Sequence, residues 1–305
     1  MKDYLNTVDT EYPIRRDESE KKAFQDFVLQ ELSDTKYNVS VKKMDKQHNN
    51  IIIGNIEKAK VVFSAHYDTP ATSLYPNLIM PRRPILTHLY HFVFPIIMAV
   101  LSLLLALVLN TLMGTSEIVF LILYLIIYFM MFLLVTQGFK NKHNKNDNTS
   151  GVACVLSLAK SNYKEDVAFV LFDNEEKGLL GSKAFNKYYK ELMKDKLVVN
   201  FDCVGLGKNV LLIAKRDASA HSLYSVLKEN VNSNEDYDVK FYPINGSVGN
   251  SDYKSFKCGI GVMVCEEKKG IGYYTSKIHT NKDEIADVEN IEFLVKEFNK
   301  FIEKI

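Results

Sequence analysis

Residues 61–70 read VVFSAHYDTP and join a short apolar run to His66 and Asp68, which stand two residues apart. The run is rich in β-branched and aromatic side chains, so it predicts a buried strand that ends at His66. Similar runs alternate along the chain with helical patterns, and this alternation predicts an α/β fold with a mainly parallel sheet covered by helices on both faces. Ligands bind at the carboxyl ends of strands in such sheets, so the polar residues that follow the strands are candidates for a site.

Three of the predicted strands end in residues able to bind a metal, namely VVFSAHYD (61–68), VAFVLFDNEE (167–176) and LVVNFD (197–202). Two loop segments that precede predicted helices add further candidates, NKNDNTSG (144–151) and KIHTNKDE (277–284). The side chains collected from these segments are His66, Asp68, Asp147, Glu175, Glu176, Asp202 and His279. Taken singly, each has an ordinary explanation as a surface group, a helix N-cap or a solvated acidic pair. Taken together, they occur at the element boundaries where a site is expected.

Imidazole and carboxylate ligands without a thiolate suit a catalytic zinc ion, or another divalent first-row metal. Two histidines and three carboxylates are too many ligands for one tetrahedral ion. They suit two ions about 3.5–4 Å apart that share a bridging carboxylate and clamp a water molecule. The sequence therefore predicts a site for two divalent metal ions, with zinc as the expected metal.

The order of these motifs resembles that of the co-catalytic zinc aminopeptidases, a family that also includes glutamate carboxypeptidase, the transferrin receptor and glutaminyl cyclase. The matching motifs are H-x-D (66–68), N-D-N-x-S-G (146–151), E-E-x-G-x-x-G-S (175–182), F-D (201–202), S-D-x-x-x-F (251–256) and I-H-T-x-x-D (278–283). Each motif is weak by itself, but six in this order make a specific signal that covers most of the chain. The resemblance implies the zinc-aminopeptidase fold, in which a mixed, mainly parallel sheet lies between layers of helices.

The resemblance also implies a role for each candidate residue. Asp147 would be the bridging ligand, with His66 and Asp202 completing one metal site and Glu176 and His279 the other. Glu175 would be the general base, because a carboxylate beside the metals can take a proton from the water and pass it to the leaving amine. Asp68 lies on the same strand face as His66, where we expect it to hydrogen-bond the second imidazole nitrogen without binding a metal.

The sequence departs from the family pattern at two places. Ile278 precedes His279, where some relatives have a tyrosine that stabilises the oxyanion of the tetrahedral intermediate; Tyr273 or Tyr274 is a candidate to replace it. Tyr253 follows Asp252, where many relatives have a histidine. Asp252 itself either supports the site or a substrate amine, or caps a helix at DYKSFK.

Two long apolar runs interrupt the α/β pattern, ILTHLYHFVFPIIMAVLSLLLALVL (85–109) and IVFLILYLIIYFMMFLLVTQ (118–137). Neither contains an acidic residue, a lysine or an arginine, and each reaches the roughly 20 residues that cross a bilayer. Two buried helices of a soluble protein are the alternative, but such helices rarely lack a polar face. We expect a transmembrane hairpin in residues 80–145, inserted in a loop between residues 1–79 and 146–305 of one catalytic domain. His88 and His91 stand one turn apart near its start, where snorkelling or a helix contact is expected before a function.

The topology of the hairpin follows from the residues on either side of it. His66 and Asp147 would bind the same ion, so the chain between them must cross the membrane an even number of times. The turn NTLMGTSE (110–117) has no basic residue. Basic residues flank the hairpin on both sides, namely Arg82 and Arg83 before it and Lys140, Lys142 and Lys145 after it. The positive-inside rule then places the catalytic domain and both termini in the cytoplasm. The four cysteines, the absence of a secretory signal pattern in the first 35 residues and the N-x-S sequon at Asn148 agree with this prediction.

The expected function is that of a membrane-tethered metallopeptidase, a dinuclear zinc aminopeptidase that acts on peptides. The alternatives are a glutaminyl-cyclase-like acyltransferase, a receptor or scaffold that keeps the fold without catalysis, and a transporter formed by oligomers of the hairpin. With 38 basic and 37 acidic residues there is no global field to attract nucleic acid, so the expected partners are a peptide and the lipid bilayer. The oligomeric state is not predicted.

Overall fold

The computed structural model describes residues 3–305 except 45–47, 74, 76, 137 and 162. The strands are β1 (Val39–Lys43), β2 (Asn49–Ile53), β3 (Val61–His66), β4 (Asn77–Ile79), β5 (Val167–Phe172), β6 (Leu197–Phe201), β7 (Asn209–Ala214), β8 (Asp238–Pro243), β9 (Gly259–Lys268) and β10 (Gly272–Ile278). The helices are α1 (Tyr4–Glu11), α2 (Glu18–Glu31), α3 (Pro84–Met113), α4 (Glu117–Thr136), α5 (Ser150–Ser161), α6 (Leu180–Tyr188), α7 (Arg216–Ser219), α8 (Ser222–Asn230) and α9 (Val288–Glu303). Short 3-10 turns cover Leu192–Lys194 and Asp252–Ser255.

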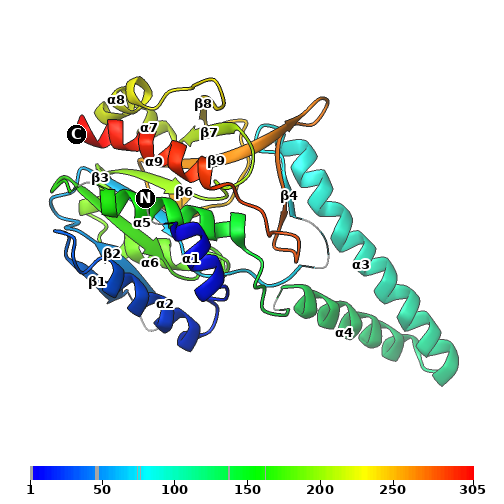
Figure 1. Ribbon diagram of the computed structural model, residues 1–305. Helices are drawn as coiled ribbons and strands as arrows, with labels where there is room; N and C mark the ends of the chain where they lie inside the picture. The colour runs from blue at the N-terminus through cyan, green and yellow to red at the C-terminus, as the bar shows by residue number, and fades with distance from the viewer. Residues whose placement is uncertain (1–2, 45–47, 74, 76, 137, 162) are drawn as a thin grey trace.

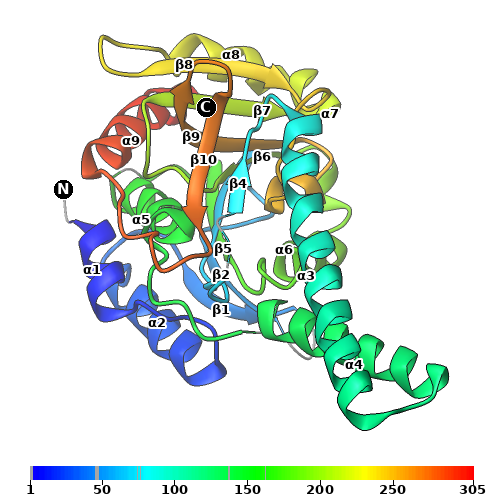
Figure 2. The same ribbon diagram turned by 90° about the vertical axis from the view of Figure 1, so that its right-hand side faces the viewer.

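The strands of the described residues form one mixed sheet in the order β1-β2-β5-β3-β6-β9-β10-β4, with β7 and β8 added beside β9. The four central strands β5, β3, β6 and β9 run parallel, and β1, β2, β7, β10 and β4 join through antiparallel pairs. Figures 1 and 2 show α1, α2, α5 and α9 on one side of the sheet and α6 on the other. The predicted α/β fold, with a mixed and centrally parallel sheet between helices, is confirmed.

Side-chain alternation along the strands divides the interior into two hydrophobic cores. Ile51 and Ile53 of β2 pack into the larger core beneath α1, α2, α5 and α9, whereas Ile52 packs into the smaller core beside α6. This period of two is the geometry of a pleated strand that is covered on both faces. The central strand β3 is buried along its whole length, which explains why its sequence reads as an apolar run.

Four elements of the structure were not predicted from the sequence, namely α1, β4, β8 and β10. The residues of β4 are only half-buried, and most of β8 is half-buried or exposed. Such strands lack the apolar run that marks a buried strand. The helical segment between β7 and β8 is divided into two short helices, α7 and α8.

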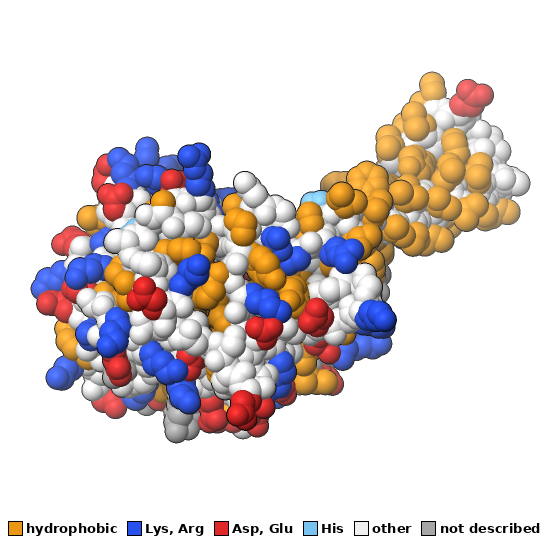
Figure 3. All heavy atoms as spheres, turned by 90° about the horizontal axis from the view of Figure 1, so that it is seen from above, with side chains coloured by type: hydrophobic (Ala, Val, Ile, Leu, Met, Phe, Trp, Pro, Cys, Tyr) orange, Lys and Arg blue, Asp and Glu red, His pale blue; other side chains and the backbone are white. Residues whose placement is uncertain are grey.

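The helices α3 and α4 project away from the domain as an antiparallel pair (Figure 1). Both are long and apolar enough to cross a membrane, and little of α3 and none of the tested stretch of α4 is buried. Figure 3 shows the projection covered almost entirely by hydrophobic side chains, whereas the domain surface carries mixed charges. The two helices start and end near the predicted limits, and Gln137 lies outside the described residues. The wider limits 80–145 of the insertion stay a prediction.

Small and flexible side chains form the contact between α3 and α4. Met98, Ser102 and Ala106 recur every fourth residue on α3 and are buried, in contrast to the exposed residues around them. The hydroxyl of Ser102 donates to the main-chain oxygen of Met98 at 2.7 Å and lies 3.3 Å from the sulfur of Met131 on α4. Small residues at this spacing let two helices approach closely in lipid.

Candidate metal centre

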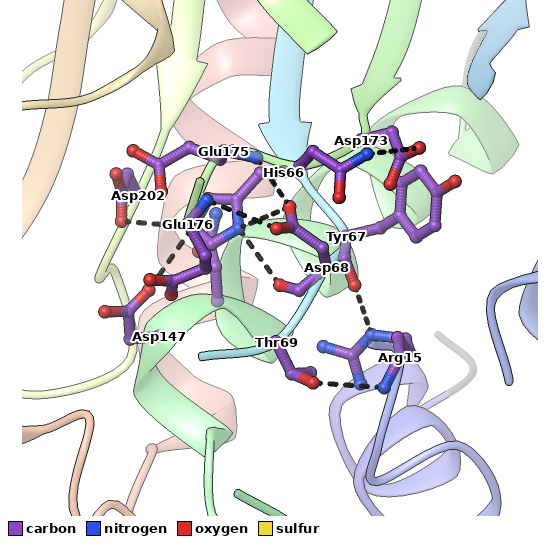
Figure 4. Close-up of polar contacts among 12 residues, drawn as sticks. Arg15, His66, Tyr67, Asp68, Thr69, Asp147, Asp173, Glu175, Glu176 and Asp202 are labelled. Carbon is purple, nitrogen blue, oxygen red and sulfur yellow. Dashed lines mark hydrogen bonds and ion pairs between the residues drawn. The ribbon is translucent and has the colours of Figure 1, made fainter. Parts of the chain in front are cut away.

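The predicted site residues meet at the carboxyl ends of three adjacent parallel strands (Figure 4). His66 is the last residue of β3, Glu175 and Glu176 follow β5, and Asp202 follows β6. Two loops complete the group, with Asp147 just before α5 and His279 just after β10. The backbone of His279 is held in the left-handed region with φ of 60°, a conformation that non-glycine residues adopt mainly at constrained sites.

One group of donors comprises His66, Asp147 and Asp202, whose ligand atoms lie within 4.8 Å of one another. Nε2 of His66 is 3.3 Å from Oδ1 of Asp147 and 3.9 Å from Oδ1 of Asp202. The other ring nitrogen, Nδ1, lies 3.1 Å from the main-chain oxygen of Asp68. Because a carbonyl oxygen only accepts, this contact places the proton on Nδ1 and leaves the Nε2 lone pair for a metal.

A second group of donors comprises Asp147, Glu176 and His279, again within 4.8 Å. Nε2 of His279 lies 3.0 Å from Oδ2 of Asp147 and 3.4 Å from Oε2 of Glu176. Asp147 therefore belongs to both groups and turns one carboxylate oxygen toward each histidine. This is the arrangement that a carboxylate shared by two cations would need.

The electrostatics of the site also favour divalent cations. Burial raises the pKa of Glu176 to about 8, and burial also raises the pKa values of Asp202 and Glu175. The buried oxygen Oε1 of Glu176 has no hydrogen-bond partner among the described residues. Several buried carboxylates thus face one small space, where ionisation is costly without positive charge. Imidazole and carboxylate donors of this kind fit zinc or a similar first-row ion.

The carboxylate of Asp68 lies beside the second imidazole nitrogen of His66, as expected, but its shorter contacts are elsewhere. The nearer contact of that ring is the Asp68 main chain, and the carboxylate oxygen Oδ1 is 3.5 Å away. The carboxylate instead accepts hydrogen bonds from the backbone N–H groups of Glu175 at 2.9 Å and Glu176 at 3.2 Å. Asp68 therefore fixes the turn that carries both glutamates (Figure 4).

The loop that carries Asp147 is held by side chains for which the sequence suggested no role. Asp283, the last residue of a quoted motif, accepts the backbone N–H groups of Asn146 and Asp147, each at 3.0 Å. The amide of Asn148 donates to the main-chain oxygen of Phe201 at 3.0 Å and accepts from the Gly151 N–H at 3.1 Å. The loop is thereby tied to the end of β6, beside Asp202.

Arg15 is a fully buried residue that no sequence pattern indicated. Its guanidinium donates to the main-chain oxygens of Tyr67 at 2.5 Å and Tyr12 at 2.6 Å. It also donates to the side-chain oxygens of Asn144 at 3.2 Å and Thr149 at 3.0 Å. Arg15 thus joins the segment before α2 to the loop that carries Asp68, as Figure 4 shows, and to the loop that carries Asp147.

The predicted substrate-binding residues lie in different places. Tyr273 and Tyr274 are on the β9–β10 hairpin, where they pair with Glu267 and Glu266 and are outside the cavities described below. Asp252 is buried beside the site, and burial raises its pKa to about 7. Its carboxylate accepts no capping hydrogen bond from any residue that the structure describes, so the helix-cap explanation of Asp252 is wrong.

A cavity of about 450 Å³ opens onto the candidate metal ligands. Asp147, Glu175, Glu176, Asp202 and His279 line it on one side. Its remaining walls are largely apolar and include Ile79, Ile213, Val248, Val262, Met263 and Ile278. Thr87, His88 and His91 of α3 also line it, so the inserted helix forms part of the site.

The family model described as peptidase family M28 matches residues 140–294, just over half of the chain. The matched segment contains four of the five metal-binding candidates, all but His66, together with Glu175, and it begins after β3 and the two apolar helices. A comparison with curated proteins gave no match.

Solved structures share the fold at low sequence identity. The LapA aminopeptidase of Legionella pneumophila matches with a TM-score of 0.58 and 14% identity, over 99% of this chain and 68% of that chain. The glutaminyl cyclase of Porphyromonas gingivalis matches with a TM-score of 0.57 and 12% identity, over 99% of this chain and 97% of that chain. The glutaminyl cyclase of Fimbriiglobus ruber matches with a TM-score of 0.54 and 14% identity, over 98% of this chain and 92% of that chain. The fold is thus common to peptidases and cyclases, and the site residues must decide between them.

Proposed function

The chain belongs to peptidase family M28, and from this premise we propose that it is a membrane-tethered zinc aminopeptidase that removes N-terminal residues from peptides. The observation that carries the proposal is the position of Asp147, whose two carboxylate oxygens face His66 and His279 at 3.3 and 3.0 Å. Glu175 lines the same cavity as Asp147 and His279, and its carboxylate is close to His66.

We assign His66, Asp147 and Asp202 to one zinc ion and Asp147, Glu176 and His279 to a second. When bound, such ions polarise the peptide carbonyl and supply a water molecule of lowered pKa. Asp283 accepts hydrogen bonds from the backbone of the Asp147 loop, and Asp68 accepts them from the backbone of Glu175 and Glu176. These hydrogen bonds hold the ligands in place before a metal binds. Side chains fixed in this way lose little freedom when they bind a metal.

Glu175 is assigned as the general base. It is buried, it lines the cavity, and its carboxylate lies within 4.8 Å of the donor atoms of His66 and Glu176. Burial raises the pKa of Glu175 well above its ordinary value. A carboxylate with raised proton affinity is suited to take a proton from water and pass it to the leaving amine. The negative charge of Asp252, a second buried carboxylate, also raises the pKa of Glu175.

A glutaminyl-cyclase-like activity is the second candidate, because the match to the cyclase of Porphyromonas gingivalis spans 97% of that chain. The shared position of Asp147 favours hydrolysis, since a second cation gives the cyclisation of an N-terminal glutamine no evident advantage. A receptor or scaffold without catalysis would have no need for Glu175 beside a complete set of donors.

We propose that the domain and both termini are cytoplasmic. Arg82, Arg83, Lys140, Lys142 and Lys145 flank the hairpin, and its turn has no basic residue. Lys140 and Lys145 also form ion pairs within the domain, with Asp17 and Glu20 and with Asp9. The sequon at Asn148 does not bear on the topology, because this side chain is fully buried and both its amide atoms are hydrogen-bonded.

The full-length protein in detergent, loaded with zinc, tests the function. We expect release of free amino acids from aminoacyl-amides, and removal of glutamine from a peptide that begins with it. Loss of ammonia from that peptide, with the glutamine residue retained, would identify a cyclase instead. Absence of both products from a zinc-loaded, folded preparation would leave the receptor or scaffold.

A further inference from the structure

The first turns of α3 belong to the active-site cavity. Thr87, His88 and His91 line the cavity that holds Glu175 and His279. His91 also lines a second cavity, of about 740 Å³, which shares Asn77, Glu176 and His279 with the first. The inserted helix is therefore a wall of the substrate site at the place where the two cavities meet. Figure 2 shows α3 running beside β4, the edge strand next to β10.

This part of α3 is docked to the domain by specific contacts. The hydroxyl of Thr87 accepts from the Met80 N–H at 3.0 Å and donates to the Met80 main-chain oxygen at 3.1 Å. The hydroxyl of Tyr75 lies 3.1 Å from Nδ1 of His91, and its ring stacks on Phe94 with centroids 4.0 Å apart. The start of α3 is thus fixed to the domain by hydrogen bonds and ring stacking.

The outward side of the same turns is apolar and exposed. Ile85 is 74% exposed, Leu89 58% and Phe92 70%, and these side chains alternate with the cavity-lining residues. A helix with one apolar exposed side and one docked side fits the boundary between a bilayer and the protein. One short helical segment therefore borders both the substrate cavity and the membrane.

The lengths of α3 and α4 indicate where along α3 the bilayer surface lies. α3 has 30 residues and ends at the turn at the tip of the hairpin, whereas α4 has 20 residues and begins at that turn. At about 1.5 Å per residue, α4 spans about 30 Å, which is the thickness of the hydrocarbon layer. The matching part of α3 reaches back to about Pro95, a residue that cannot donate to the His91 main-chain oxygen and so favours a bend there. Residues 84–94 are the part of α3 that extends beyond the length of α4, and this part lies at the level of the membrane surface.

We propose that the substrate is the N-terminal segment of a membrane-attached polypeptide, which reaches the metal centre along α3 from the bilayer surface. This inference rests on the proposed aminopeptidase activity and names its substrate class. The apolar walls around Ile79, Val262 and Met263 would take an apolar first side chain, and the chain that follows would pass His91 toward the bilayer.

The test uses the zinc-loaded full-length protein in liposomes. One N-terminal sequence is offered as a free peptide and also joined to a transmembrane helix by flexible linkers of about 4, 12 and 30 residues, whose maximum reach is about 14, 42 and 105 Å. We expect the shortest linker to give a rate at least about tenfold above the free peptide at equal total concentration. The rate should fall about fivefold from the shortest linker to the middle one, because effective concentration falls with length.

Two variants relate this preference to the outward side of α3. Phe92→Glu should reduce the preference for the anchored substrate and keep the rate on the free peptide. Leu192→Glu, a matched change at an exposed apolar residue on the domain surface, should alter neither rate.

Two results would overturn the inference while leaving the aminopeptidase intact. One is equal cleavage of free and anchored substrates. The other is cleavage of the anchored substrate only with the longest linker, which would place the metal centre far from the bilayer. A zinc-loaded protein that cleaves neither these substrates nor an aminoacyl-amide would overturn the proposed function and the inference together.

Discussion

Replacing Asp283 by asparagine should weaken metal binding although Asp283 is not a ligand. Its two carboxylate oxygens accept the backbone N–H groups of Asn146 and Asp147, each at 3.0 Å, and the residue is buried. An asparagine keeps one oxygen but turns an NH₂ group toward the other N–H, which it cannot accept. The loop that presents Asp147 to both donor groups then loses one of the two hydrogen bonds that the Asp283 carboxylate accepts from it.

The magnitude follows from the bond that is lost. A hydrogen bond to a charged group contributes about 1.5–3 kcal/mol, and each 1.4 kcal/mol corresponds to a factor of ten in affinity. If the chain stays folded, the loss should appear as a decrease in zinc affinity of about 10- to 100-fold. This agrees with the usual effect of removing a residue that orients a metal ligand.

Competition with a chelator of known affinity measures this loss on the full-length protein in detergent. Circular dichroism checks that the variant is folded, and Asp217→Asn is the matched control, because Asp217 is an exposed aspartate at the surface. A zinc affinity of Asp283→Asn within twofold of the wild type would refute the role of this carboxylate.

The remaining predictions concern the adjacent glutamates, the topology and the buried arginine. Glu175→Gln should retain zinc and lose activity by about 10²- to 10⁴-fold, whereas Glu176→Gln should lose zinc, as measured by metal analysis and rate on the same samples; equal zinc loss in both would contradict the assignment. In intact cells, an impermeant maleimide should label Ser116→Cys at the exposed tip but Lys142→Cys only after permeabilisation, both in a cysteine-free background; the reverse pattern would invert the topology. Arg15→Met should lower the free energy of unfolding by at least about 3 kcal/mol, because buried acceptors lose their donor, and an unchanged denaturation midpoint would contradict this.

The sequence predicted the elements that are buried and the residues that end them. Apolar runs marked β3, β5 and β6, because strands covered on both faces are mostly apolar, and the order of the motifs indicated the ligands at or just after their ends. The structure places His66, Asp202 and Glu176 together as expected from strands that are neighbours in the sheet. The roles of these residues in binding and catalysis stay predictions.

The contacts that were not predicted depend on tertiary packing. Arg15 stands alone in the sequence, and only the folded chain brings it to Asn144 and Thr149, more than a hundred residues away. Tyr273 and Tyr274 are close to His279 in sequence, but β10 runs as an antiparallel hairpin with β9 and carries them away from the cavity.

The inserted helices show the same limit of sequence reasoning. Hydropathy predicts that α3 can span a membrane, yet it cannot separate the residues in lipid from those that wall a cavity. His88 and His91 were expected to snorkel or to contact another helix, and the structure places both in the lining of the active-site cavity.

Titration of the metal-free, full-length protein with zinc tests the dinuclear site most directly, with hydrolysis of an aminoacyl-amide as the readout. If Asp147 is shared by two ions, activity should reach its maximum only when two equivalents are bound, and Asp147→Ala should bind neither ion at the wild-type affinity. Full activity with one equivalent bound, or with none, would contradict the two-metal centre.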